Sequence, residues 1–283
     1  MKIAINYAND RFLKQQKYNT KTAYKKGKFD KVIEYGPNNI DIDFYKKYSY
    51  LVKQTKGSGY WIWKPYIIHK TLNEISIGDY LFYCDSGAYY INKIDYLIEC
   101  MENSKQDIMI FELPLIEKQW TKRDAFILMD CDEAKYTDDN QRLASFILIK
   151  KSDFTVMFIN EYLKFCEDPR ILTDQQNVCR KDNYDCFIDH RHDQSILSLL
   201  SKKYDLKAFR DPSEYGTIPE NYIHGARKMS TKDILYKLKD YPNSSYPEII
   251  RHCRSSNIKS YKLKIMVKKC IPGKILKYYF LKF

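Results

Sequence analysis

The chain has 283 residues, 44% of them apolar, which is enough for one large α/β domain and excludes general disorder. The formal charge of +12 is unevenly distributed, because residues 249–283 hold ten Lys or Arg and no Asp or Glu, leaving about +2 for the rest. A basic groove is not indicated in this nearly neutral body, so we expect no nucleic-acid partner.

The first residues pass from a short apolar run into polar sequence without a signal-peptide core, and no run of about 18 apolar residues follows. The eight cysteines form no CxxC pair, so neither a zinc knuckle nor a disulfide framework is indicated. We expect a cytoplasmic protein with reduced thiols.

Strand-like and helix-like segments alternate along the chain. Strands are expected at 2–6, 32–35, 80–84, 107–111 and 144–149, and helices at 43–52, 65–72, 94–101, 154–166 and 193–203. This alternation predicts an α/β fold with a largely parallel sheet and helices on both faces. Ligands bind beyond the carboxyl ends of strands in such sheets, and Asp85 follows the strand 80–84 at such an end.

The sequence becomes basic and interrupted after Pro242, with Pro247 and Pro272-Gly273. We predict a boundary near residue 240, which separates a domain over 1–240 from a basic, mostly helical appendage over 241–283. Apolar and aromatic residues interleave with the cations of this appendage, which suits contact with an anionic membrane surface. Alternatively, the apolar residues pack on the domain while the lysines are solvated.

Three segments carry side chains suited to chemistry. Residues 78–88 deliver Asp85 from a buried strand onto a turn that Gly87 permits, where a carboxylate could hold a divalent ion on a diphosphate or simply cap a turn. Residues 56–65 combine two glycines, two tryptophans and Lys64, which suit a phosphate ligand. The alternative is a packed loop with both tryptophans in the core and Lys64 in solvent.

The third segment is Asp189-His190-Arg191-His192-Asp193-Gln194. Such a cluster can supply a general base, a metal ligand or hydrogen bonds to sugar hydroxyls. In the simpler interpretation, Asp193 is the N-cap of the helix 193–203.

In order and spacing, these segments resemble bacterial glycosyltransferases of the GT-A type, in particular a group associated with capsule and O-antigen synthesis. The shared features are a glycine-aromatic WxWKP segment, an Asp-small-Gly turn after a strand, and a His-Asp-Gln-Ser helix start, here residues 59–65, 83–87 and 192–195. The resemblance covers roughly residues 1–230. It implies a single GT-A-like catalytic domain, with a Rossmann-like nucleotide-binding half and an acceptor-side half from about residue 110.

We expect Asp193, Gln194 and Asp85 to be catalytic. The Asp193-Gln194 pair also resembles the Asp-Gln segment of glycosyltransferase family eight, which implies a retaining reaction. In an inverting reaction, Asp193 or Asp124 would take the acceptor proton. The expected donor-binding residues are Ala4, Asn6, Tyr7, Trp63, Lys64, Asp85, Ser86, Gly87 and Arg227.

The polar segment 117–124 surrounds Trp120, whose aromatic face suits an acceptor sugar. We expect Trp120, Arg123, Asp124 and His192 to bind the acceptor, although an exposed loop with a half-buried Trp120 is the alternative.

The resemblance implies a divalent metal ion, Mn²⁺ or Mg²⁺, held by Asp85 and His224. Gly87 stands where a DxD motif has its second Asp, so Asp193, His192 or His224 would have to complete the set.

We interpret the chain as a bacterial glycosyltransferase that moves a hexosyl-type sugar, with a UDP-sugar as the expected donor, onto a glycan or lipid-linked oligosaccharide in surface polysaccharide synthesis. We expect it on the inner face of the cell membrane. The alternatives are a non-catalytic membrane-associated interaction protein with a transferase-like fold and a nucleic-acid-binding protein.

Overall fold

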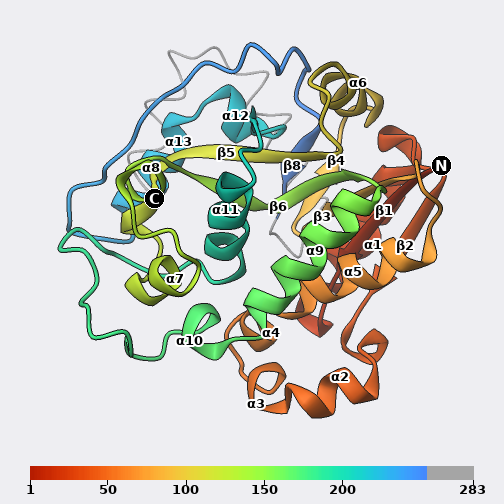
Figure 1. Cartoon of the computed structure of the whole chain (residues 1–283). Helices are drawn as coiled ribbons and strands as arrows, with labels where there is room; N and C mark the ends of the chain where they lie inside the picture. Colours follow the sequence, from red (N-terminus) through yellow and green to blue (C-terminus); the bar gives the residue numbers. More distant parts are fainter. Residues whose placement is uncertain (254–283) are drawn as a thin grey trace, which may run out of the picture.

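A computed structural model describes residues 1–253 of the chain (Figure 1). The main sheet in this part of the chain has six strands in the order β2-β1-β3-β6-β5-β7, and β4 and β8 form a separate pair. The strands are β1 (Lys2–Tyr7), β2 (Lys31–Tyr35), β3 (Tyr80–Cys84), β4 (Ala88–Tyr90), β5 (Ile108–Ile116), β6 (Asn140–Lys150), β7 (Ala208–Arg210) and β8 (Ile250–His252).

The main sheet is parallel except for one reversed strand. Strand β1 pairs in parallel with β2 and β3, and β5 pairs in parallel with β7. Strand β6 lies between β3 and β5 and is antiparallel to both. The predicted α/β class is therefore confirmed, and the predicted strand 144–149 is the second half of β6.

Helices cover both faces of the sheet. They are α1 (Leu13–Thr22), α2 (Ile42–Lys47), α3 (Ser49–Val52), α4 (Gly57–Tyr60), α5 (Trp63–Glu74), α6 (Asp95–Asn103), α7 (Arg123–Leu128), α8 (Ala134–Thr137), α9 (Asp153–Cys166), α10 (Pro169–Leu172), α11 (Asp193–Lys203), α12 (Glu214–Thr217) and α13 (Glu220–Arg227). The predicted helix 43–52 is wrong in extent, because the chain breaks at Tyr48 into α2 and α3.

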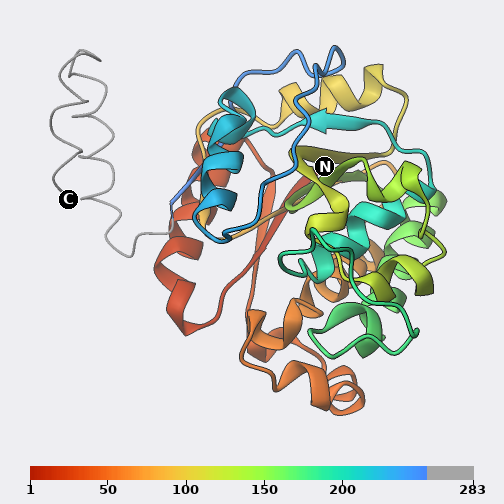
Figure 2. The ribbon, with the colours of Figure 1, turned by 90° about the vertical axis from the view of Figure 1, so that its left-hand side faces the viewer.

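Two apolar layers sandwich the sheet, because successive strand side chains point to opposite faces. Ile108 and Ile110 of β5 join a core with α5, α9 and α11, whereas Met109 and Phe111 join a second core with α6 and α13. Figure 2 shows α9 and α11 on one side of the sheet and α1 and α13 on the other. The first core thus packs α5 and α11 against the central strands of the sheet.

The described part of the expected appendage, residues 241–253, packs on the main body. Tyr246, Ile249 and Ile250 are buried in the second core, and β8 pairs with β4. Residues 254–283 lie outside the described residues, so the boundary near 240, the helical appendage and its membrane contact stay predictions. No helix within residues 1–253 is both long enough and apolar enough to cross a membrane.

Candidate active site

A cavity of about 500 Å³ opens at the carboxyl ends of β3 and β5, where an α/β sheet places its ligands. The reversed strand β6 contributes alternate side chains to its wall, since residues two apart face the same side. Residues from both halves of the chain line it, among them Lys56, Trp61, Lys64, Asp85, Gln141, Leu143, Ser145, His190, Arg191, His192, Asp193, Gln194, Tyr215 and Tyr222.

Asp85 follows β3 directly and faces this cavity with a side chain that is 38% exposed. Its backbone N–H donates to the carbonyl of Ser145 at 2.9 Å, and the Tyr83 hydroxyl donates to its Oδ1 at 2.5 Å. Burial, together with the Asp85 charge, raises the pKa of Tyr83 well above its ordinary value, so the phenol keeps its proton. The carboxylate is therefore held on one side and open to a ligand on the other.

Lys64 forms a buried ion pair with Asp193 beside Asp85. The Lys64 Nζ lies 2.6 Å from Asp193 Oδ2 and 4.0 Å from Asp85 Oδ1, and the Lys64 and Asp193 side chains are each 4% exposed. Burial alone lowers the pKa of Lys64, but the two carboxylates outweigh it and the pKa lies above its ordinary value. The ammonium therefore stays charged, and the alternative of a solvated Lys64 is wrong.

The predicted N-cap role of Asp193 is also wrong. Asp193 is the first residue of α11, preceded by His192 at the N-cap, and its carboxylate turns to Lys64 and to the hydroxyl of Tyr162 at 3.3 Å. A buried ammonium attracts a carboxylate more strongly than a backbone N–H does. Asp193 thus joins α11 to α5 at the cavity wall.

A left-handed turn brings Lys64 to this position. All five residues from Gly57 to Trp61 have positive φ, between 52° and 98°. This conformation costs roughly 1–2 kcal/mol for each residue with a side chain. Asn9 donates to the Ser58 hydroxyl at 3.0 Å, and the Trp63 indole donates to the Gly57 carbonyl at 3.0 Å, so neighbouring segments hold the turn.

The two tryptophans after this turn have different places. Trp61 lines the cavity and stacks on the His192 ring at a centroid distance of 5.4 Å. Trp63 is buried and stacks on Tyr7 at 3.8 Å, at the end of β1. Of the predicted donor residues, Tyr7 and Trp63 therefore pack against each other outside the cavity lining, whereas Lys64 and Asp85 line the cavity.

The imidazoles of His190 and His192 are neutral, because burial lowers the pKa of both. The carbonyls of Ile171 and Leu172 can only accept, so His190 donates through Nε2 and His192 through Nδ1, each at 2.8 Å. His190 also accepts from the Lys122 N–H at 3.2 Å and is fully satisfied. His190 thus fixes the loop before α11.

Gln194 is fixed at the cavity wall by strand β6. Its Oε1 accepts from the Ala144 N–H at 3.3 Å, and its Nε2 donates to Gln141 Oε1 at 2.8 Å. An amide held on both sides presents a constant face to a substrate. Gln194 therefore lines the same cavity as Lys64 and Asp85.

Other predicted donor and metal residues lie elsewhere. Ala4 and Asn6 are buried in β1, and Asn6 bonds to Asn19 and Gln16. Ser86 is buried, and its hydroxyl donates to the Tyr7 carbonyl at 2.5 Å, while Gly87 accepts from the Cys253 N–H at 2.6 Å. These residues support the turn at Asp85. Arg227 and His224 are exposed on α13 and are not in the cavity wall.

The predicted acceptor platform is wrong. Trp120 is fully buried, and the Arg191 guanidinium covers its ring at 4.5 Å, so no sugar can stack there. Arg123 pairs with Asp132 at 2.9 Å, and buried Asp124 accepts from the N–H groups of residues 178 and 179. These residues anchor the irregular segment 174–189. Of the predicted acceptor set, only His192 lines the cavity.

Sequence reasoning missed several lining residues. Arg191 and Trp61 lie within segments that the sequence marks as candidates for chemistry, but nothing in the sequence distinguishes their orientation. Ser145 lies in the predicted strand 144–149, whose pattern does not show that this residue faces a cavity, and Gln141, Tyr215 and Tyr222 come from segments without a recognisable pattern.

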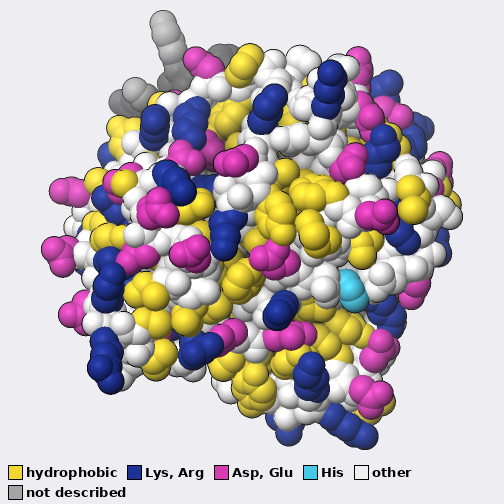
Figure 3. All heavy atoms as spheres, viewed as in Figure 1, with side chains coloured by type: hydrophobic (Ala, Val, Ile, Leu, Met, Phe, Trp, Pro, Cys, Tyr) yellow, Lys and Arg dark blue, Asp and Glu magenta, His cyan; other side chains and the backbone are white. Residues whose placement is uncertain are grey.

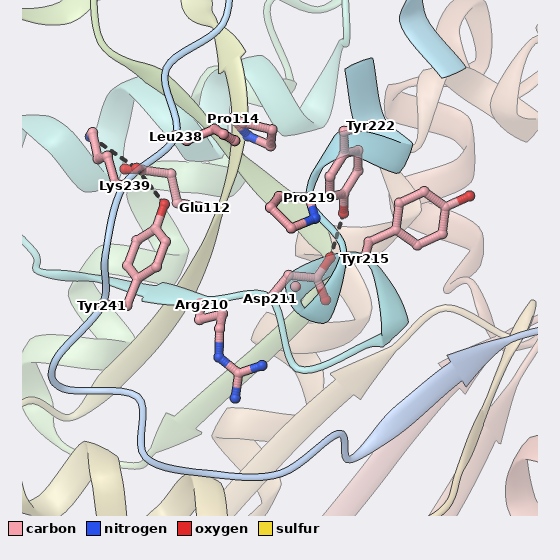
Figure 4. Close-up of a pocket in the computed structure, with 11 residues that line it drawn as sticks. Glu112, Pro114, Arg210, Asp211, Tyr215, Pro219, Tyr222, Leu238, Lys239 and Tyr241 are labelled. Atoms are coloured by element: carbon pink, nitrogen blue, oxygen red, sulfur yellow. Dashed lines mark hydrogen bonds and ion pairs between the residues drawn. The ribbon is translucent and has the colours of Figure 1, made fainter. Parts of the chain in front are cut away.

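A smaller hollow of about 60 Å³ adjoins the cavity and shares Tyr215 and Tyr222 with it (Figure 4). Asp211 and Glu112 lie on opposite sides of this hollow. Both carboxylates already accept hydrogen bonds, Asp211 from Tyr222 at 2.5 Å and Glu112 from Tyr241 at 2.8 Å. The volume corresponds to about two water molecules, so the hollow is too small for a sugar.

The side chains at Asp85 do not fit the expected divalent ion. Within residues 1–253, no three His, Cys, Asp or Glu side chains are grouped to hold one. The carboxylate on the other side of Lys64, that of Asp193, is paired with the ammonium, which also approaches Asp85. Hard cations of this kind need several free oxygen ligands, which this arrangement lacks.

No protein-family model matches the sequence, and a search of curated proteins finds no match. Among solved structures, the chain is similar to apo mouse xyloside xylosyltransferase 1, at 11% identity over 91% of this chain and 97% of that chain, with a TM-score of 0.45. The galactosyltransferase LgtC, solved with donor and acceptor sugar analogues, is similar at 13% identity over 97% of this chain and 98% of that chain, with a TM-score of 0.46. The apo glycosyltransferase GlyE of Streptococcus pneumoniae is similar at 12% identity over 90% of this chain, with a TM-score of 0.40. This match covers 55% of GlyE, little more than half of its length.

Proposed function

We propose that the protein is a glycosyltransferase that moves a sugar from a nucleotide-sugar donor to a glycan acceptor. The observation that carries the proposal is the partly exposed Asp85 carboxylate, which lies beside the Lys64–Asp193 pair in the cavity at the carboxyl ends of the strands. The volume of about 500 Å³ lies within the range of small-molecule sites. The sequence resemblance to GT-A enzymes rests on the same segments.

The reaction requires charge stabilisation more than covalent chemistry. The bond from the sugar's anomeric carbon to the diphosphate breaks with its electron pair on the phosphate oxygen, and the acceptor oxygen forms the new bond to that carbon. Overall, the hydroxyl proton ends on the released nucleotide or in solvent. Lys64 stabilises the departing charge, and a preorganised donor of this kind typically contributes 10²–10³-fold to a rate.

The other lining residues have roles that follow from their chemistry. The fixed Gln194 amide and the Asp85 carboxylate offer hydrogen bonds to sugar hydroxyls beside the anomeric carbon. Trp61 supplies an apolar surface to the cavity wall, and Arg191 supplies a cation. This wall replaces Trp120 as the surface on which we expect the acceptor to rest.

The finer assignment is a UDP-linked hexose as donor and a lipid-linked oligosaccharide as acceptor, in the synthesis of a bacterial capsule or O-antigen. A cytoplasmic position on the inner face of the membrane follows if the ten cations of residues 249–283 contact anionic lipids. The resemblance to surface-polysaccharide enzymes and the composition of this segment support the assignment.

The mixed surface charge disfavours a nucleic-acid partner. On the face seen in Figure 3, Lys and Arg side chains are interspersed with Asp and Glu, without a uniformly basic area. Nucleic-acid binding depends on a continuous row of cations facing phosphates. A small-molecule substrate in the cavity is therefore the better account.

The test is sugar transfer by the purified protein. UDP-, GDP-, CMP- and dTDP-linked sugars are incubated with oligosaccharide and lipid-linked acceptors, and nucleotide release and product mass are measured. We expect one donor class to give an acceptor-dependent product with Asp85 intact and not with Asp85→Asn. Equal nucleotide release by both proteins would contradict the assignment to this cavity.

A further inference from the structure

Lys64 occupies the space between two carboxylates that come from different halves of the chain. Its Nζ is 2.6 Å from Asp193 at the start of α11 and 4.0 Å from Asp85 at the end of β3. The same ammonium lies 5.3 Å from the centre of the Tyr83 ring. A single positive group thus lies between the two acids at the cavity wall.

Both carboxylates accept hydrogen bonds from the protein itself, which reduces their capacity to coordinate a metal ion. The Tyr83 hydroxyl donates to Asp85, and the Tyr162 hydroxyl donates to Asp193. Burial raises the pKa of Tyr83 and of Tyr162 well above the ordinary value, so both remain donors. Each acid therefore has a protein donor in addition to the ammonium.

The backbone that leads to Lys64 is held in an unusual conformation. The left-handed turn at 57–61 leads directly into α5, where the Lys64 N–H donates to the Trp61 carbonyl at 2.9 Å. Strained backbone of this kind persists where the surrounding structure over-determines it, and it is often found at functional sites. The Lys64 side chain is buried but still lines the cavity, so a ligand can reach its ammonium.

We infer that the Lys64 ammonium replaces the divalent metal ion as the cation that binds the donor diphosphate. This inference rests on the proposed function. An ammonium carries three N–H donors, and the pair with Asp193 uses one of them. Asp193 and Tyr162 position Lys64, whose remaining donors reach phosphate oxygens and stabilise the negative charge that develops on the leaving nucleotide.

The first experiment compares the wild-type protein in excess EDTA with the same protein in Mn²⁺ or Mg²⁺. We expect the donor-induced rise in melting temperature and the transfer rate to differ by less than about twofold between these conditions. Activity that EDTA abolishes and Mn²⁺ restores would overturn the inference while leaving the proposed function intact. Absence of donor binding and transfer under every condition would instead remove the proposed function.

The second experiment removes the ammonium. Lys64→Met should lower the transfer rate at least about 100-fold, but it also leaves Asp193 buried without its partner. The double variant Lys64→Met/Asp193→Asn removes both charges and can still accept the Tyr162 hydrogen bond. We expect the double variant to regain most of the lost melting temperature and to remain slow.

Lys70→Met is the matched control, since Lys70 lies on the same helix and pairs with Asp41 at the surface, 2.7 Å away. It should leave the transfer rate and the EDTA result unchanged. Transfer by the folded double variant at nearly the wild-type rate in EDTA would show that Lys64 is only structural and would overturn the inference.

Discussion

Helix α11 carries a buried ion pair at each end, and the two pairs differ in how completely their hydrogen bonds are satisfied. At the far end, Lys202 lies 2.9 Å from Glu117, which is fully buried. Glu117 also accepts from Thr121 at 2.6 Å, from Gln141 at 2.8 Å and from Ser198. At the near end, Asp193 has Lys64 and Tyr162, and the pair borders the cavity.

This difference separates a structural pair from a functional one. A carboxylate with four protein donors has no capacity left for a ligand, whereas an ammonium at a cavity wall can bind one. Gln141 connects the two ends, because it donates to Glu117 and accepts from Gln194. The saturated end therefore supports the geometry of the open end.

Glu117→Gln tests the saturated end and should have the largest effect. It leaves the Lys202 ammonium buried without its carboxylate, which typically costs about 3–5 kcal/mol in the free energy of unfolding. The transfer rate per folded molecule should stay within about threefold of wild type, since Gln can still accept from Thr121. Denaturant unfolding and specific activity measure the two quantities. A stable but inactive variant would contradict the distinction.

Asp85→Asn tests the open end. We expect the transfer rate to fall by about 10²–10³-fold, or roughly 3–4 kcal/mol in the barrier, because the carboxylate faces the substrate. The melting temperature should barely change, since an amide oxygen can still accept from Tyr83. The transfer rates and melting temperatures of the variant and the wild-type protein are compared. A variant that is less stable but transfers sugar at the normal rate would show that Asp85 has only a structural role.

Gly57→Ala tests the turn that leads to Lys64. A Cβ at this position would approach the Trp61 ring to 2.3 Å in a left-handed conformation. We expect a loss of about 2 kcal/mol in unfolding free energy together with weaker donor binding, because Trp61 and Lys64 must shift. The control is Gly78→Ala, which has a positive φ but no atom within 4 Å, and it should leave donor binding unchanged.

For His190 we predict a smaller effect, on the pH dependence of the free energy of unfolding. Burial lowers its pKa well below the ordinary 6.5, so the unfolded chain binds a proton where the native protein does not. The contribution of His190 to the free energy of unfolding is fully present above about pH 6.5. It falls as the pH decreases toward the pKa of the native protein, by at most about 1.4 kcal/mol per pH unit. His190→Gln should flatten this slope, and unchanged slopes would contradict the neutral imidazole.

The fold class and the edge of the binding site could be predicted because they depend on local patterns. The apolar run before Asp85 specified a strand and hence a position at its carboxyl end. The reversal of β6 could not be predicted, because an apolar strand looks the same in either direction. The break at Tyr48 lies within a segment whose spacing still looks helical.

The contacts between the residues of the site could be identified only from the structure. Lys64 and Asp193 each belong to a recognisable segment, but no pattern in the sequence indicates that they pair, because they come from separate helices. Trp120 looked exposed because its neighbours in sequence are charged, whereas Arg191 from a distant segment covers it. Side-chain neighbours far apart in the chain are set by tertiary packing, which a single sequence does not encode in a readable way.

The most direct test of the central claim is a thermal-shift titration of the wild-type protein, in EDTA, with nucleotide sugars of the four base classes. One class should raise the melting temperature in a saturable manner, and the rise should be lost in Asp85→Asn and kept in Lys70→Met. No rise with any donor, or an equal rise in Asp85→Asn, would contradict a donor site formed by Asp85, Lys64 and Asp193.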